Sequence, residues 1–448
     1  MKICIINNLY PPYARGGAEQ VVERTVTGLL DEGHEVVLIT TINKTKQQHI
    51  QTKSPRFSGI LTPLDGVRPN GGTHNAGQIS PLQRDPHASG RSPSEWRNSQ
   101  CGTNFKFFQT HQFKPRNLFY YTDAHKHSFV VRCVWHVIDM FHVGSARFVR
   151  QVLKEEKPDV VHTHNLMGVG FLIPRVIRSL GIHHIHTVHD VQLVEPSGII
   201  LKTKEKSWRY AGLPTKLYTC VMKRLMGSPD VVISPSKFLK SFYEERGFFP
   251  KSTFVVVRNP MTISDYGQTM SDYETSPSTR FLYLGQVEDH KGIVFLAQVF
   301  KQFFEIYRNV QLHIVGDGSA MAHVQHIAEG CAGIILHGRV GRDALPALFA
   351  HTDVTVVPSL CYENSPTVIF ESFSFGVPVL ASNIEGIAEL IDQGENGWTF
   401  EAGDMQDVQE KMRWCVEHRR ELKVMRNSIP KTVQLSGNYI ESIMALYC

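Results

Sequence analysis

Short apolar runs alternate with amphipathic helical segments along most of the chain. Apolar runs predict strands at 2–7, 35–40, 159–162, 184–188, 230–233 and 253–257, and again at 281–284, 312–315, 334–336, 354–357 and 377–380. Helices are predicted between them, such as one from Ala18 to a stop at Gly33 and one from a cap at Ser236 to Gly247. This alternation is typical of parallel α/β sheets. Because it occurs twice, we expect two doubly wound, Rossmann-like domains facing a central cleft.

The length of 448 residues suits two domains of about 200 residues each. Residues 261–280 are polar and indicate a linker, so we place the first domain at 1–260, the second at 261–430 and a final helical segment at 431–448. One region does not fit. Residues 54–104 contain six Pro and seven Gly without periodicity, which predicts a disordered insertion at about 44–104. We expect 105–141, which is richer in aromatics, to be partly helical and near the acceptor.

The composition is that of a soluble globular protein, with 42% hydrophobic and 20% charged residues. No apolar run approaches the roughly 18–20 residues of a membrane-spanning helix. The opening MKICIINN has too short an apolar core for a signal peptide and predicts a strand. Eight scattered cysteines without a C-x-x-C pair predict reduced thiols and argue against a zinc cluster. We therefore expect a cytoplasmic protein.

The net charge of +5 is too small to predict nucleic-acid binding, but basic residues cluster at 201–224. This segment contains seven Lys or Arg residues and a single acidic residue, Glu205, and the basic residues are interleaved with Trp208, Tyr210, Leu217 and Tyr218. Such a mixture suits the face of an anionic membrane. A solvated helix with its aromatics in the core explains the same pattern, so both interpretations stay open.

The segment 358–382 predicts a strand end, a loop, a helix and a further strand. Asn364 or Ser365 can cap the helix, Pro366 suits its first turn, and Gly376 can end it in the left-handed conformation. Glu363 then lies just before the helix and Glu371 inside it. A helix N-terminus is a natural phosphate site, and carboxylates beside it can accept hydrogen bonds from sugar hydroxyls. Alternatively, Glu363 favours the helix dipole and Glu371 is solvated.

Further candidates lie at the ends of other predicted strands. Gly16 and Gly17 follow the first strand, where glycine lets the backbone approach a ligand closely. His189 is expected at the carboxyl end of its strand, on the edge where the cleft should lie. His162 and His164 also lie near a strand end, and we interpret them mainly as residues that shape loops.

These residues resemble the E-x7-E motif and accompanying loops of the family-4 retaining glycosyltransferases. The motif matches at Pro358, Ser359, Glu363, Glu371, Gly376, Pro378, Val379 and Ala381, with Ser372 where Ala is usual. The family's other motifs follow in the same order along the chain: the G-G-x-E loop, the T-x-H-D of His189, Lys291-Gly292, Gly316-Asp317-Gly318, 337–340, 385–390 and 394–397. The resemblance covers nearly the whole chain except about 44–104. Gln286 stands where the family has an arginine, which puts catalytic competence in doubt, because glutamine cannot balance the diphosphate charge. Arg15 is a candidate to compensate.

The resemblance implies a GT-B fold and retaining transfer of a sugar from a nucleotide diphosphate to a hydroxyl. It assigns Glu363 to the donor sugar, His189 to a contact from the first domain and Lys291 to the leaving diphosphate. The other donor-binding positions are Gly16, Gly17, Gln286, Gly316, Val340, Ser365 and Glu371, with Glu371 on the ribose. It also implies a last helix that crosses back to the first domain.

The expected partners are a nucleotide-diphosphate sugar and a glycan or lipid-linked acceptor of cell-envelope or polysaccharide biosynthesis. No metal or other cofactor and no nucleic acid is expected. Two alternatives stay open: a non-catalytic sugar-nucleotide-binding protein, and another GT-B enzyme such as a nucleotide-sugar epimerase.

Overall fold

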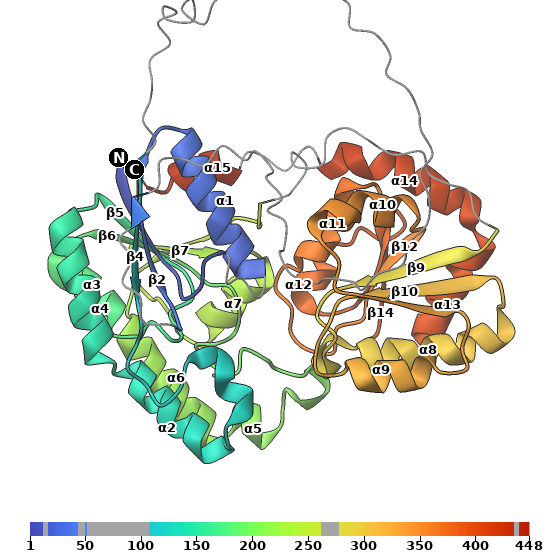
Figure 1. The fold of residues 1–448 in the computed structure, drawn as a ribbon, viewed down its shortest axis with the longest axis horizontal. Helices are drawn as coiled ribbons and strands as arrows, with labels where there is room; N and C mark the ends of the chain where they lie inside the picture. Colours follow the sequence, from blue (N-terminus) through green and yellow to red (C-terminus); the bar gives the residue numbers. More distant parts are fainter. Residues whose placement is uncertain (12–16, 44–49, 52–106, 261–276, 434–438, 448) are drawn as a thin grey trace, which may run out of the picture.

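The structure is a computed structural model that describes residues 1–11, 17–43, 50–51, 107–260, 277–433 and 439–447. These residues form two α/β domains that lie side by side, with both chain termini on the first (Figure 1). Outside the described residues lie Arg15, Gly16, most of the expected linker and the expected disordered insertion except for residues 50–51, which form a strand. Within the described ranges, no helix is both long and apolar enough to cross a membrane.

The first domain is built on an eight-stranded sheet with strand order β3-β4-β2-β1-β5-β6-β7-β8. Its strands are β1 Lys2–Ile6, β2 Glu35–Thr41, β3 Ile50–Gln51, β4 Phe108–Phe113, β5 Val160–Thr163, β6 His183–Thr187, β7 Val231–Ser234 and β8 Thr253–Val256. Every neighbouring pair is parallel except β3 with β4. Because both faces are covered, β1, β5 and β7 are buried nearly throughout, and β1 and β7 are mostly apolar.

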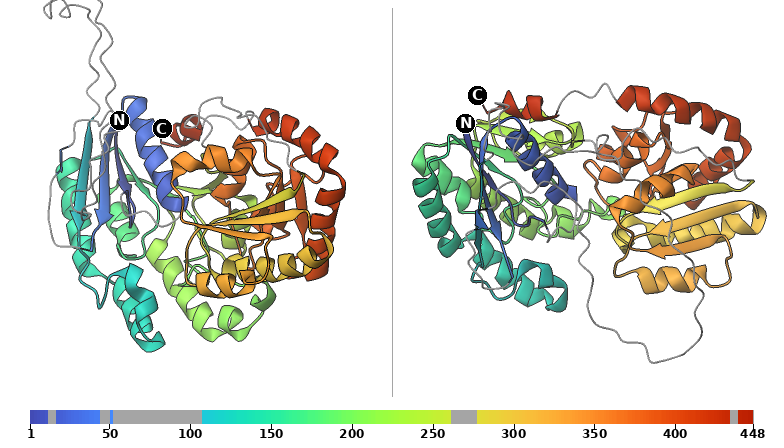
Figure 2. Two further views of the ribbon diagram at one scale, coloured as in Figure 1. Left: turned by 45° about the vertical axis from the view of Figure 1, so that its right-hand side comes forward. Right: turned by 45° about the horizontal axis from the view of Figure 1, so that its top comes forward.

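Helices cover the two faces of this sheet (Figures 1 and 2). They are α1 Gly17–Asp31, α2 Phe129–Met140, α3 Val143–Glu156, α4 Ile173–Leu180, α5 Trp208–Ala211, α6 Leu213–Met226 and α7 Lys237–Glu245, with 3-10 turns η1 Tyr121–Lys126 and η2 Lys202–Lys204. One core cluster joins α3, α4, α6 and α7 to one face of the sheet, and another joins α1 to the other face. The expected cap of α7 is confirmed, since the Ser236 side chain accepts from Leu239 N.

The second domain has a parallel six-stranded sheet with strand order β11-β10-β9-β12-β13-β14. The strands are β9 Thr279–Leu284, β10 Val310–Val315, β11 Ile334–Gly338, β12 Val354–Val357, β13 Val379–Ser382 and β14 Gly397–Phe400. The helices are α8 Ile293–Ile306, α9 Met321–Ala328, α10 Leu345–Ala350, α11 Thr367–Ser374, α12 Glu385–Ala388, α13 Met405–Glu417 and α14 Arg419–Val433, with η4 Asp289–Lys291 and η5 Arg342–Ala344. One large apolar cluster forms its core.

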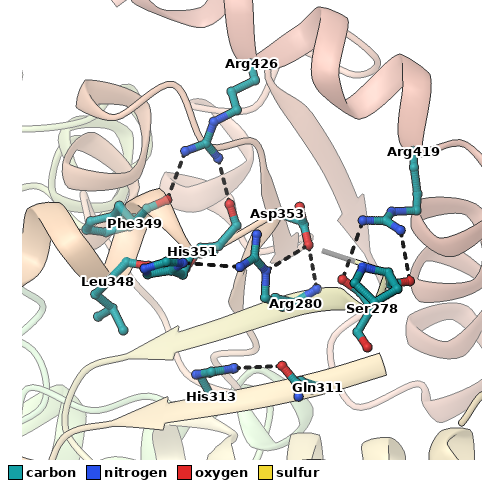
Figure 3. A network of polar contacts seen from close by, with 12 residues as sticks. Ser278, Arg280, Gln311, His313, Leu348, Phe349, His351, Asp353, Arg419 and Arg426 are labelled. Atoms are coloured by element: carbon teal, nitrogen blue, oxygen red, sulfur yellow. Dashed lines mark hydrogen bonds and ion pairs between the residues drawn. The ribbon is translucent and has the colours of Figure 1, made fainter. Parts of the chain in front are cut away.

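A buried polar network fixes the amino ends of β9 and β12 (Figure 3). Asp353 accepts from Arg280 N at 2.7 Å, and its Oδ2 lies 3.6 Å from Arg280 Nε. Arg426 of α14 donates to the carbonyls of Phe349 and Thr352 at 2.9 and 2.6 Å. Ligands bind at the carboxyl ends of parallel strands, so this network lies at the opposite end of the sheet and is structural.

The last described helix, α15 Tyr439–Met444, packs on the first domain. Ile443 lies in the core cluster that α1 covers, and the Tyr439 hydroxyl lies 3.1 Å from Thr25 Oγ1. Tyr447 reaches deeper, where its hydroxyl lies 2.7 Å from His162 Nδ1. The chain therefore starts and ends in the same domain.

The structure departs from the expected elements in several places, and among these the strands β3 and β14 were not predicted. The segment around 105–141 contains α2 but also the strand β4, which was missed because its sequence FQTHQF is polar. The expected caps of α11 are also wrong. Pro366 occupies the N-cap position, and the structure shows no side-chain cap there among the described residues. Gly376 does follow the helix in the left-handed conformation, as expected, with a φ of +69°.

Candidate functional site

The loop between β12 and α11 brings Glu363 against a lysine from the neighbouring strand's loop. Lys291 Nζ forms an ion pair with Glu363 Oε1, and Ser359 Oγ donates to the same oxygen at 3.0 Å. Burial opposes the charge on Lys291, but the adjacent Glu363 carboxylate outweighs it and raises the pKa of the amine. In the unliganded protein a cation and an anion therefore neutralise each other at the edge where ligands are expected.

Two glycines hold this loop against its neighbours. Gly292 has a φ of +73°, and a Cβ there would lie 1.8 Å from Pro358 O. A Cβ on Gly386, at the start of α12, would lie 2.3 Å from Glu363 O. Any side chain at either position would displace the loop that carries Glu363, so glycine is required for the close backbone packing.

The same loop contacts the first domain across the cleft. Asn364 Nδ2 donates to His189 O at 2.7 Å, and Asn259 Nδ2 donates to Ser365 O at 3.2 Å. Gly17, the first residue of α1, faces Thr367, the first residue of α11, since a Cβ on Gly17 would lie 3.1 Å from Thr367 Cγ2. The amino ends of two helices from different domains thus converge, and the first N–H groups of a helix have no partner within the helix itself.

The His189 ring belongs to a row of histidines at the carboxyl ends of β5 and β6. Its Nε2 lies 2.9 Å from His164 Nδ1, and burial lowers the pKa of His189 to about 4. The ring is therefore neutral at neutral pH. His164 Nε2 is buried without a partner among the described residues. Burying an unpaired ring nitrogen that is an acceptor costs less free energy than burying an unpaired N–H, so His164 Nε2 carries no proton. The His164 proton is then on Nδ1 and is donated to His189 Nε2. The neutral His189 ring therefore carries its own proton on Nδ1.

A small cavity of about 20 Å³ lies beside this row, lined by His164, His186, His189, Asp190 and Tyr243 among others. Its volume matches roughly one water molecule. Burial raises the pKa of Asp190 to about 6 even though Asp190 accepts from Gln192 N at 2.8 Å. At neutral pH the His189 ring is thus neutral, whereas most of the Asp190 carboxyl is still ionised.

Glu371 lies one turn after Thr367 on α11 and is 9% exposed. The alternative in which it is solvated is therefore wrong. Ser365, at the start of the same helix, is buried, and no described residue bonds its hydroxyl.

The remaining expected positions lie along the carboxyl edge of the second sheet. Gly316 follows β10 with a φ of +143°, and a Cβ there would lie 1.8 Å from Gly285 O, so the loops after β9 and β10 are in backbone contact. Gln286 is exposed in the first of these loops, and its carbonyl accepts from the Tyr283 hydroxyl at 2.5 Å. Val340 follows β11 and packs against a small apolar cluster. Gly16 lies outside the described residues.

Sequence reasoning missed the strap that joins 200–205 to the Glu363 loop. Leu201 and Cys361 form an antiparallel bridge in which Lys202 N donates to Leu360 O and Tyr362 N donates to Ile200 O, both at 2.9 Å. Lys202 also pairs with Glu385 of α12. No local motif marks this contact, because it joins residues about 160 positions apart.

No group of three or more His, Cys, Asp or Glu side chains in the described parts of the chain is arranged to bind a metal ion. The charged groups of the site are Lys291 and Glu363, supplemented by the positive ends of helices. This arrangement suits an anionic ligand that also carries hydroxyl groups.

Comparisons with known proteins agree with this geometry. Residues 278–418 match a family described as "Glycosyl transferases group 1", and residues 114–264 match "Glycosyltransferase Family 4". A Klebsiella pneumoniae protein, described as an uncharacterized 42.6 kDa protein in the cps region, is 22% identical over 411 residues, which cover 91% of each chain. The lipopolysaccharide 1,2-N-acetylglucosaminetransferase of Salmonella typhimurium is 28% identical over 227 residues, covering 46% of this chain and 59% of that protein.

Solved structures show the same fold. HepE of Anabaena in complex with UDP superposes with a TM-score of 0.62 at 13% identity, and the match covers 99% of both chains. The expected fold of two Rossmann-like domains is confirmed as GT-B. Together, the two family matches and this fold support a glycosyltransferase.

Proposed function

We propose that this chain, whose two halves match glycosyltransferase families, is a retaining glycosyltransferase that uses a nucleotide-diphosphate sugar. Its acceptor is a hydroxyl of a glycan or a lipid-linked precursor in polysaccharide or cell-envelope biosynthesis. The observation that carries the proposal is the Lys291–Glu363 pair at the amino end of α11, joined through Asn364 to His189 of the other domain.

The pair explains how the site takes a donor. A diphosphate competes with the Glu363 carboxylate for the Lys291 ammonium and also meets the free N–H groups of α11. Glu363 is thereby freed to accept hydrogen bonds from sugar hydroxyls. We assign Glu371, one turn inside α11, to the ribose of the donor.

The neutral His189 ring suits a contact with the sugar. With its proton on Nδ1, it offers one donor without adding positive charge where an oxocarbenium-like centre would develop. In the scheme that we propose, the bond between the anomeric carbon and the diphosphate breaks while the acceptor oxygen bonds the same face of that carbon. The acceptor proton passes to the departing phosphate oxygen. Lys291 and the helix end stabilise the negative charge that accumulates there, which is the role given to preorganised donors in other enzymes.

Gln286 remains the unusual member of the site. It lies at the edge that faces the diphosphate, but an amide donates a single weaker bond where a guanidinium would give two and a charge. We therefore assign charge stabilisation to Lys291, with Gln286, Gly316 and Val340 placing the nucleotide. Gly17 faces the diphosphate from the first domain.

Two relatives support this assignment by their own names. The Salmonella protein is a lipopolysaccharide N-acetylglucosaminetransferase, and the Anabaena structure holds UDP. We infer a nucleotide-sugar donor and a glycan or lipid-linked acceptor here, in the cytoplasm, with peripheral membrane contact through 201–224.

The test is to incubate the protein with a panel of UDP-, GDP- and ADP-sugars and to measure release of nucleoside diphosphate with and without acceptor glycans. The proposal predicts release that depends on one donor and is lost in Lys291→Met. Release should persist in Lys301→Met, since Lys301 on α8 donates to the backbone carbonyls of Ile327 and Glu329. Tight donor binding without turnover, unchanged by Gln286→Arg, would favour a sugar-nucleotide-binding protein. Interconversion of the free nucleotide sugars would favour an epimerase.

A further inference from the structure

The outer face of α2 is apolar and has no covering element among the described residues. Val130, Val134, Val137 and Phe141 recur at helical spacing and form one exposed stripe along the helix. Val130 is 69% exposed and Phe129, beside it, is 72% exposed. In a water-soluble helix this stripe would face the core, so its orientation toward the outside needs an explanation.

The opposite face of α2 explains why the helix keeps this orientation. Trp135 is buried and its Nε1 donates to Phe119 O at 2.7 Å, while Asp139 accepts from Gly168 N at 3.0 Å. Gly168 lies in the loop after β5. The helix is therefore anchored through its polar and aromatic side to the carboxyl edge of the sheet, and the valine stripe is fixed outward.

The helices α5 and α6 extend the same exposed apolar surface. Trp208 and Leu213 are 73% and 75% exposed, and Leu217 follows one turn later on α6. Tyr218, in contrast, is turned inward and donates to Gln192 O at 3.1 Å. Met140 of α2 and Met222 of α6 belong to the same core cluster, against which Tyr218 packs, so α2 and α6 lie on the same side of the sheet (Figures 1 and 2).

Charge distinguishes this surface from the rest of the protein. The segments 114–141 and 201–224 together contain 11 Lys or Arg against three Asp or Glu, a net charge of +8. The whole chain has a net charge of +5, so the remaining residues carry a net charge of −3. One of the three acids, Asp139, is buried, and another, Asp123, is paired with Lys126 at 2.8 Å. A partner that is both apolar and negatively charged therefore complements this surface.

We propose that α2, α5 and α6 form one surface that binds an anionic lipid bilayer, with the α2 stripe and Trp208 entering the interface and the basic residues contacting headgroups. This inference deepens the proposed function, since it rests on a lipid-linked acceptor and extends the contact from 201–224 to α2. A protein partner would need an acidic groove that matches both exposed helix faces, those of α2 and of α5 with α6. A membrane surface is a continuous plane and can contact both faces at once.

The position of the surface fits this role. The Tyr120 hydroxyl, just before η1, lies 2.9 Å from Thr41 Oγ1 at the end of β2, and α2 packs on the loop after β5 through Asp139 and Gly168. α6 packs on the loop after β6, which contains His189. The lipid-binding surface therefore lies at the edge of the sheet that carries the His189 side of the site, where a lipid-linked acceptor would arrive.

The experiment is vesicle flotation with phosphatidylcholine vesicles that contain phosphatidylglycerol, compared with pure phosphatidylcholine. We expect the wild type to float only with the anionic vesicles and to be released by high salt, since polybasic attraction is screened. Val130→Asp with Val134→Asp should weaken binding at least roughly tenfold, because a carboxylate is costly in the interface. Val424→Asp is the matched control, since Val424 on α14 is also 69% exposed, and it should bind like wild type.

A second variant, Lys204→Glu with Lys216→Glu, keeps the apolar stripe and should lose the preference for anionic vesicles. Wild-type protein that floats with neither vesicle would overturn the proposal, as would equal binding by the α2 variant and the Val424 control. Conversion from dimer to monomer by the α2 variant, without any vesicle binding, would assign the surface to a second copy of the chain instead. Circular dichroism checks folding of each variant.

Flotation requires neither donor nor turnover, so its outcome is independent of the proposed function. Binding of nucleoside diphosphate to the α2 variant, measured by calorimetry, should match wild type. Vesicle binding without release of nucleoside diphosphate would support the lipid-binding surface and contradict the transferase proposal. Release of nucleoside diphosphate without vesicle binding would support the transferase proposal and contradict the lipid-binding surface.

Discussion

Replacing Glu363 by glutamine separates the two roles of the Lys291–Glu363 pair. The change keeps the shape of the side chain, and Ser359 Oγ can still donate to its carbonyl oxygen. It removes the negative charge that raises the pKa of Lys291. Lys291 is then a partly buried cation without its partner.

The stability cost follows from the exposure of the pair. Breaking a fully buried ion pair costs about 3–5 kcal/mol, whereas an exposed pair contributes about 0–1 kcal/mol. The Lys291 and Glu363 side chains are 28% and 14% exposed, between these limits. We therefore expect a loss of about 1–2 kcal/mol, which lowers the Tm by roughly 2–8 °C for a domain of this size.

The effect on ligands has the opposite sign. A nucleoside diphosphate no longer competes with the carboxylate, so Glu363→Gln should bind it about tenfold more tightly, an effect of about 1.4 kcal/mol. Lys291→Met should bind it roughly 10- to 100-fold more weakly, since a hydrogen bond to a charged group contributes about 1.5–3 kcal/mol. Turnover of the nucleotide sugar should fall in both variants. Isothermal titration calorimetry with the diphosphate that binds wild type best measures the affinities. Equal weakening in both variants would refute the assigned competition.

Three further outcomes follow from the structure. Gly292→Ala should lower the Tm and weaken donor binding, because a φ of +73° is strained for alanine and its Cβ would clash with Pro358 O and displace the Glu363 loop. Unchanged thermal unfolding would contradict this. Gln286→Arg should raise turnover without raising stability, which steady-state kinetics checks, and no gain would argue that Lys291 already suffices. Burial raises the pKa of Asp139 from 3.8 to about 7, so its protonated form is favoured in the fold and stability is lost as pH rises through that range. The Tm of Asp139→Asn relative to wild type should therefore increase from acidic pH to pH 8, and a pH-independent difference would contradict it.

Most of the strands that sequence reasoning placed correctly are buried on both faces, although the edge strands β8 and β11 were also placed and are partly exposed. Runs such as 354–357 are buried throughout and mostly apolar because helices cover both sides of the sheet, and this signal is local. The strand Phe108–Phe113, which lies between β2 and the short edge strand β3, lacks that signal. Its buried residue is His111, whose ring contacts Glu156 at 2.9 Å, so a polar pair replaces the apolar pattern.

The candidate site divides in a similar way. Glu363, Lys291 and Gly292 were identified by position in motifs, and the structure places them in contact. The strap between Leu201 and Cys361 was not foreseeable, because the pairing depends on how the two domains meet. The caps of α11 failed for a related reason. Both candidate cap residues contact the first domain instead of capping the helix. Asn364 Nδ2 donates to His189 O, and Ser365 O accepts from Asn259 Nδ2.

A crystal structure with a 2-fluoro nucleotide-sugar analogue bound tests the central claim most directly. The account predicts a diphosphate between Lys291 Nζ and the amino end of α11, the sugar hydroxyls on Glu363, the sugar ring against His189, and the ribose on Glu371. It also predicts that Lys291 and Glu363 have separated. A nucleotide bound elsewhere, or one bound here while the Lys291–Glu363 pair stays closed, would contradict it.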